Sequence, residues 1–202
     1  MSTSLSTVCK LIVASSDLPA IEAIVRTHMA RAGTVTVEDA EWPVTDSESF
    51  RNGDDEPDVF SLQAGEHYAE LYFNSFCRNE TLARTLSAEL GTEVLVLIYQ
   101  STAEACHWGY YRDGRARRIL ESGDGELLAS EGEPFDFERE SGGCDDESEH
   151  VFDADDMEDY NRRLGLDVRL YQEPLPGWRI LRRERNHASQ TGQSDRPWWK
   201  LW

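Results

Sequence analysis

Hydrophobic and polar positions alternate with different periods along the chain, and the clearest changes of period fall between Glu66 and Gly114. The longest apolar run, Val94–Tyr99, lies within this stretch. A continuous apolar strand is usually covered on both faces, so we expect the core to close over it. The aromatic-rich segment His67–Phe73 predicts a strand before this run. Trp108–Tyr111 predicts a strand after it, which ends in an Asp113-Gly114 hairpin turn.

Two other segments place apolar residues at helical spacing. Ile21–Ala32 follows the capping residues Ser15–Asp17 and has Pro19 in its first turn. Glu80–Leu90 follows Asn79, a residue that commonly caps helices, and is ended by a glycine. We therefore expect two helices that lie on the same face of one sheet.

The order strand, helix, strand occurs twice, with an offset of about sixty positions. The first unit runs from Val8–Ala14 to Thr34–Val37, and the second runs from Tyr72 to the Val94–Tyr99 strand. Two such units form β-α-β-β-α-β. The sequence thus predicts an α+β fold with a ferredoxin-like core, in which two helices pack on one face of a mainly antiparallel sheet.

The pattern predicts further elements around this core. Val59–Leu62 is expected to pair with His67–Phe73, and a β-meander after Gly114 is expected to extend the sheet on the Val94–Tyr99 side. Asp155–Leu164 has acidic residues first and arginines last, which suits the dipole of a short helix. Two more candidate strands follow, at Val168–Tyr171 and Trp178–Leu181.

These elements predict a single α+β domain over residues 1–185, with an acidic loop at about 138–152. Residues 186–202 form a polar linker and a tail rich in tryptophan, Pro197–Trp202. Tryptophan is rarely left in water, so we expect Trp198 or Trp202 to fold back onto the domain. The alternative is that the tail anchors a partner protein.

Charge narrows the range of partners. The net charge is -19 in 202 residues, which argues against nucleic acid and anionic membranes as partners and favours a basic protein. The 4 cysteines form no CxxC pair, and no apolar stretch is long enough for a secretion signal or a membrane span. We therefore expect a cytoplasmic protein without disulfides.

The spacing of the cysteine, histidine and acidic residues does not match any catalytic or metal-binding motif that we considered. Cys106 and His107 are adjacent in a predicted strand, so their side chains point to opposite faces and cannot form a dyad. The histidines have no HxH or HExxH spacing, and a calcium loop starting at Asp153 would place Glu158 where glycine is needed. We expect no metal, no cofactor and no enzymatic activity.

Two segments carry a resemblance. Tyr110–Gly114, preceded by Leu86–Leu95, resembles small bacterial proteins in which a helix ends in LGT, a hydrophobic strand follows, and an aromatic strand turns at RDG. Some of these are similar to immunity proteins that neutralise polymorphic toxins, and Pro197–Trp202 resembles a tail of such proteins. The resemblance implies an inhibitor of a toxin, and it implies no functional residue.

The leading hypothesis is a non-enzymatic acidic protein that neutralises a basic partner, as an immunity protein does for its cognate toxin. Carboxylates can occupy sites where a nuclease expects phosphates, and they speed association. A regulatory or scaffold module is the first alternative, and an unrecognised hydrolase is the second. The candidate partner-binding residues are Asp145, Asp146, Glu147 and Glu149, followed by Asp54, Asp55 and Glu56.

Overall fold

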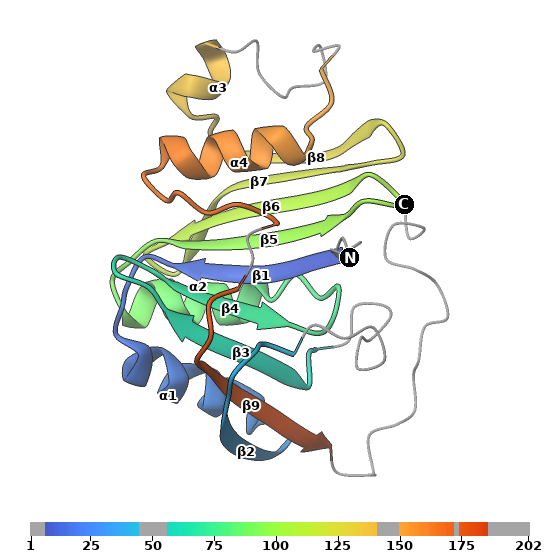
Figure 1. Ribbon diagram of the computed structural model, residues 1–202. Coiled ribbons are helices and arrows are strands. Elements are labelled where there is room, and N and C mark those ends of the chain that lie inside the picture. Colours follow the sequence, from blue (N-terminus) through green and yellow to red (C-terminus); the bar gives the residue numbers. More distant parts are fainter. Residues whose placement is uncertain (1–6, 45–55, 141–149, 172–173, 186–202) are drawn as a thin grey trace.

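The structure, a computed structural model, describes residues 7–44, 56–140, 150–171 and 174–185 (Figure 1). In this part of the chain, nine strands form one sheet in the order β2-β9-β3-β4-β1-β5-β6-β7-β8. The first five strands are β1 (Thr7–Val13), β2 (Gly33–Ala40), β3 (Val59–Ala64), β4 (Ala69–Phe73) and β5 (Val94–Gln100). The other four are β6 (Ala105–Arg112), β7 (Arg115–Gly123), β8 (Glu126–Gly132) and β9 (Trp178–Arg185). The helices are α1 (Leu18–Met29), α2 (Glu80–Glu89), α3 (Asp136–Glu140) and α4 (Ala154–Arg163).

Each pair of neighbouring strands is antiparallel, so the expected α+β class with a mainly antiparallel sheet is confirmed. The apolar run of β5 lies between β1 and β6, and its residues from Val94 to Ile98 are buried, as expected. The predicted pairing of β3 with β4 and the meander from β5 to β8 are also present.

Helices α1 and α2 cover one face of the sheet (Figure 1). Alternate residues of β1, including Leu11 and Val13, pack there against Ile21 of α1 and Leu86 of α2. Asp17 caps α1 by accepting a hydrogen bond from the Ala20 backbone N–H at 3.1 Å. The two predicted helices therefore share a face of the sheet.

Asn79 precedes α2, but the prediction that its side chain caps the helix is wrong. Its backbone is left-handed, with φ of 49°, and its side-chain amide donates to the carbonyl oxygen of Cys77 at 2.9 Å. In this orientation the side-chain oxygen of Asn79 accepts no hydrogen bond from the first turn of α2. The helix therefore begins without a side-chain cap.

The opposite face of the sheet is covered by α4 and by segment 166–170, which follows it (Figure 1). The candidate strand Val168–Tyr171 is wrong, because this segment bonds to side chains in place of a neighbouring strand. The Leu170 N–H donates to Glu158 at 2.8 Å, and the Val168 carbonyl accepts from Asn161 at 3.3 Å. The Arg169 carbonyl accepts from Lys10 at 2.6 Å.

The strand predicted at Thr34–Val37 is present as β2. Among the described strands it lies at the edge of the sheet and pairs only with β9. The C-terminal strand β9 separates it from β3. Gly33 allows this pairing, because a Cβ at that position would collide with the backbone carbonyl of Glu184. The last described strand of the chain is thus placed inside the sheet.

Candidate functional site at the acidic end of the sheet

The structure places only one of the seven predicted partner-binding residues. Asp145, Asp146, Glu147, Glu149, Asp54 and Asp55 lie outside the described residues, and Glu56 lies within them. The predicted acidic loop at 138–152 is described only at its two ends. Glu138 belongs to α3 and is fully buried, and Phe152 is buried in the core.

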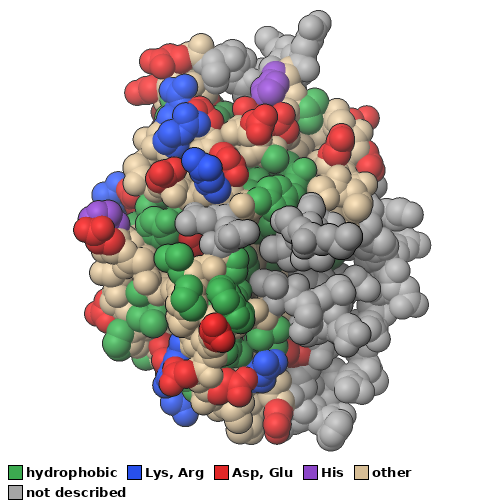
Figure 2. Space-filling model, in the orientation of Figure 1, with side chains coloured by type: hydrophobic (Ala, Val, Ile, Leu, Met, Phe, Trp, Pro, Cys, Tyr) green, Lys and Arg blue, Asp and Glu red, His purple; other side chains and the backbone are tan. Residues whose placement is uncertain are grey.

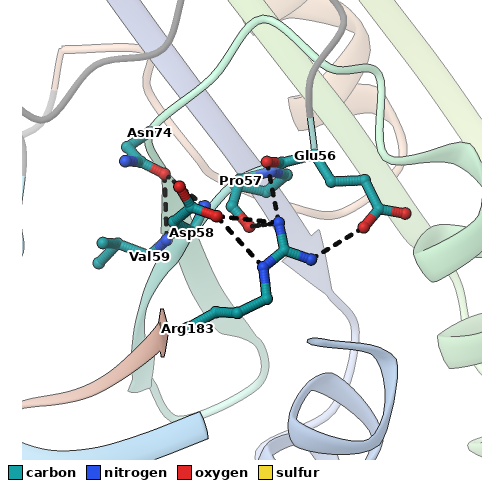
Figure 3. A network of polar contacts seen from close by, with 6 residues as sticks. All are labelled: Glu56, Pro57, Asp58, Val59, Asn74 and Arg183. Carbon is teal, nitrogen blue, oxygen red and sulfur yellow. Dashed lines mark hydrogen bonds and ion pairs between the residues drawn. The ribbon is translucent and has the colours of Figure 1, made fainter. Parts of the chain in front are cut away.

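Glu56 belongs to a network around Arg183 of β9 (Figure 3). The Arg183 guanidinium donates to the Glu56 carboxylate at 2.9 Å and to the Asp58 carboxylate at 3.0 Å. It also donates to the backbone carbonyls of Glu56 and Pro57, and Asn74 accepts hydrogen bonds from the N–H groups of Asp58 and Val59. The carboxylate of Glu56 is therefore engaged within the fold, where it helps to fix the start of β3 against β9.

Two other arginines of β9 also pair with acids from the N-terminal part of the chain. Arg179 contacts Glu22 and Asp39, and Arg182 contacts Glu38. These strand arginines therefore neutralise carboxylates of the N-terminal part of the chain and not those of its acidic middle. The geometric reason is the position of β9 between β2 and β3, which brings its side chains next to N-terminal carboxylates.

Acidic side chains of the middle of the chain gather at one end of the sheet, where the β5–β6 turn, the β7–β8 turn and the start of α4 meet. We call this group the acidic end, and its members are Glu104, Asp124, Glu126, Asp153, Asp155 and Asp156. Carboxylates are visible over the start of α4 in Figure 2. The N–H of Asp124 donates to the Ala103 carbonyl at 3.4 Å, which ties the two turns together. The Ser122 hydroxyl donates to the Phe152 carbonyl at 2.5 Å, which ties β7 to the residue before Asp153.

The start of α4 holds its carboxylates in fixed positions. Asp153 accepts from the N–H groups of Asp155 and Asp156, and Asp156 accepts in return from the N–H of Asp153 at 3.0 Å, which is a reciprocal cap. The positive end of the helix dipole favours negative charge here. Asp156 also lies 2.7 Å from the exposed His150 ring. In the described part of the chain, no Lys or Arg pairs with Glu104, Asp124, Glu126 or Asp155.

Cys106 lies beneath the acidic end, where burial and the negative charge both raise the pKa of its thiol. Burial and the carboxylates of Asp153, Asp156 and Glu104 raise the pKa of the Cys106 thiol to about 12, although a hydrogen bond with Ser122 acts in the opposite direction. The thiol is therefore neutral at physiological pH, and it cannot serve as a nucleophile of the thiolate type. The acidic end therefore presents carboxylates above a buried Cys106 thiol that is held in its neutral form.

His107 faces the other side of the sheet from Cys106, as its place in the strand predicts. Its Nδ1 lies 2.7 Å from a carboxylate oxygen of Glu121, whose other oxygen accepts from Arg78 at 2.7 Å. The side chains of His107 and Glu121 are each 1% exposed. This group connects the meander to the segment before α2 within the core, so we interpret it as structural.

No match came from comparison with family models, with curated proteins or with solved structures. In the described residues, no group of three or more His, Cys, Asp or Glu side chains is placed to hold a metal ion. Nor does any helix of this part of the chain have the length and apolarity to cross a membrane.

The sequence contained a signal for the acidic end that our prediction did not use. In an antiparallel meander, alternate turns lie at the same end of the sheet. The turns that contain Glu104 and Asp124 are alternate turns of the predicted meander, so their shared end follows from the pattern. The position of α4 beside these turns does not follow from it, because helix packing depends on the tertiary fold.

Proposed function

We propose that this protein binds a basic protein through the acidic end and thereby neutralises it, as an immunity protein blocks a bacterial toxin. The observation that carries the proposal is the convergence of two sheet turns and a helix start on one surface. Four of its carboxylates pair with no Lys or Arg among the described residues: Glu104, Asp124, Glu126 and Asp155. Lysine and arginine side chains of a partner would form ion pairs with these carboxylates.

Charge complementarity of this kind acts mainly on association. A net charge of -19 attracts a basic protein over long range, and a cluster of carboxylates at one end orients the encounter. The carboxylates sit on short turns and in a capped first turn, so little conformational entropy is lost when the partner binds. A partner that uses cationic side chains to bind phosphate would lose access to them.

The acidic residues at 145–149 precede α4 closely in the sequence, so the proposal includes them. Glu149 is the neighbour of His150, which contacts Asp156 at the acidic end. We propose that Asp145, Asp146, Glu147 and Glu149 contribute to the same binding surface. The second predicted group is less suitable, because the Glu56 carboxylate is held by Arg183.

The experiment compares association rates of two variants that carry equal net charge. The first replaces Glu104 and Glu126 by Gln and Asp124 and Asp155 by Asn. The control replaces four exposed acids elsewhere: Glu41, Glu66 and Glu89 by Gln, and Asp167 by Asn. The partner is a basic protein captured from the native host, and its association is measured by stopped-flow at low and high salt.

We expect the first variant to associate about tenfold more slowly at low salt, and the control to stay within about twofold of the wild type. The difference should shrink at high salt, because exposed charges are screened over about 8 Å at physiological ionic strength. Equal slowing of both variants would mean that only net charge matters and would refute a localised site. A captured partner whose activity is unchanged in the complex would refute neutralisation.

We also propose a ferredoxin-like unit within the larger sheet, made of β1, α1, β3, β4, α2 and β5. Support comes from the strand order β3-β4-β1-β5 and from the two helices on one face. In this arrangement β3, and not β2, takes the place of the second strand of the unit. The remaining strands extend the unit on both sides.

A further inference from the structure

A groove with a volume of about 730 Å³ lies between the β6–β7 hairpin and the segment that leads from β8 into α3. This size falls within the roughly 300–1,000 Å³ that is typical of small-molecule sites. Tyr110 and Phe135 form its deeper, aromatic part, and Arg112, Arg117 and Arg139 are its exposed basic residues. The β6–β7 turn is at the opposite end of the meander from the acidic end, so the groove is a separate feature.

The wall of the groove is held by a buried ion pair. Arg118 and Glu138 have side chains that are 1% and 0% exposed, and their closest atoms are 2.6 Å apart. Arg118 also donates to the Glu131 carbonyl at 3.2 Å, and Glu138 accepts from the N–H of Phe135 at 3.1 Å. Gly132 allows β8 to approach β7 closely just before this segment, because a Cβ there would collide with the backbone of Arg117. The aromatic ring of Phe135 is therefore positioned by the fold, where it also packs against Phe137 and Trp108.

Two of the three arginines of the groove are held only by exposed ion pairs, whereas Arg112 pairs at 3.2 Å with Glu93, whose side chain is 30% exposed. Arg117 pairs with Asp113 at 3.0 Å, and Arg139 pairs with Glu133 at 3.3 Å. The side chains of Asp113 and Glu133 are 63% and 89% exposed, and exposed ion pairs contribute little. A guanidinium has five N–H donors, so donors remain for a second anion. An anionic ligand can therefore bind Arg117 and Arg139 at little cost in free energy from weakened ion pairs.

We propose that this groove binds a small molecule that joins an aromatic ring to an anionic group. The ring packs against Phe135 and Tyr110, where aromatic side chains already contact one another with ring centroids 5.3 Å apart. The anionic group accepts hydrogen bonds from the arginines, whose forked donors match phosphate and carboxylate. Three arginines and three carboxylates line the groove, so the formal charges of its lining residues balance in a chain of net charge -19.

The test is a titration of the full-length protein, followed through its backbone amide resonances by NMR. Phenyl phosphate is the main probe, phenol supplies the ring alone, and inorganic phosphate supplies the anion alone. We expect phenyl phosphate to shift the resonances of residues 110–117 and 132–139 in a saturable manner. Phenol and inorganic phosphate should each bind about tenfold more weakly, because each lacks one half of the contacts. Benzoate should also bind, and the tighter of the two aromatic anions identifies the anionic group.

Two double variants with equal net charge separate the groove from general electrostatics. Arg117→Gln with Arg139→Gln should weaken phenyl phosphate binding about tenfold or more. Arg26→Gln with Arg182→Gln changes the same charge on α1 and β9, away from the groove, and should leave binding within about twofold. Shifts that do not saturate, or that map outside the groove, would overturn the proposal. So would equal binding of inorganic phosphate and phenyl phosphate, or equal effects of the two double variants.

Discussion

Buried charged side chains among the described residues include Lys10, Arg118 and Arg183, which are held by hydrogen bonds and ion pairs. Lys10 is 0% exposed, and its ammonium donates to the Arg169 carbonyl and lies 3.5 Å from Glu70. Burial lowers the pKa of Lys10, and Glu70 acts in the opposite direction. Arg183 and Arg118 are similarly enclosed. The sequence identifies none of these residues, because an arginine in a strand looks the same whether its side chain meets solvent or a buried carboxylate.

Arg183 and its neighbour Arg182 allow a matched test of this distinction. Arg183→Met would leave the Asp58 carboxylate, 11% exposed, without its partner, and removing one member of a buried pair costs about 3–5 kcal/mol. Arg182→Met breaks only the exposed pair with Glu38 and should cost less than about 1 kcal/mol. The free energies of unfolding are compared in urea at neutral pH. Similar values for the two variants would show that the Arg183 network does not stabilise the fold.

Among the elements, the helices and most strands follow from local patterns. Helix α4 occupies Ala154–Arg163, within one residue of the predicted Asp155–Leu164, because its acidic start, reciprocal cap and basic last turn are all local features. Helix α3 was missed, because its five residues carry too little periodicity to be recognised. Val168–Tyr171 was mistaken for a strand, because its buried residues Val168 and Leu170 alternate with exposed ones, although this segment pairs with no described strand.

The contact between α4 and the sheet depends on Asn161. Its side-chain oxygen accepts from the indole N–H of Trp108 at 3.0 Å, and its amide donates to the Val168 carbonyl. Asn161→Ala would leave the fully buried Trp108 N–H without an acceptor, which costs about 1–3 kcal/mol. Arg162→Ala, on the exposed side of the same helix, should cost less than about 1 kcal/mol. Chemical unfolding monitored by tryptophan fluorescence measures both, and an Asn161 effect no larger than the Arg162 effect would contradict this role.

For the whole molecule, the sequence predicts the class of the fold and the neighbours of most central strands, but not the complete strand order. Strands β3 to β4 and β5 to β8 are joined by short turns, so their pairing follows from sequence proximity. The insertion of β9 between β2 and β3 does not follow, because it joins residues more than 100 positions apart. The arrangement of the candidate site likewise does not follow from sequence proximity. The acids were visible as a group, and their arrangement depended on how α4 packs.

Because β9 is inserted between β2 and β3, the C-terminal part of the described chain is necessary for the stable folding of the rest. Strand β2 has no other neighbour among the described strands, and Trp178, Ile180 and Leu181 of β9 are each at most 3% exposed. Burying each of these side chains is worth about 1.5–3 kcal/mol, and the Arg183 network adds to this. Their summed loss approaches the total stability of a typical domain, about 5–15 kcal/mol. We therefore expect a chain ending at residue 171 to lose cooperative unfolding, whereas a chain ending at residue 185 retains it.

The comparison is made by urea unfolding with circular dichroism and by hydrogen exchange of the amides of β2 and β3. A synthetic peptide of residues 174–185 should restore protection to β3 in the shorter chain if it refills the place of β9. Unchanged unfolding of the chain ending at 171 would mean that β9 adds little to the sheet. The chain ending at 185, compared with the full-length protein, tests the predicted packing of Trp198 or Trp202. A tail that folds back should raise the unfolding midpoint of the full-length protein, because burial of a large aromatic side chain contributes about 2–3 kcal/mol.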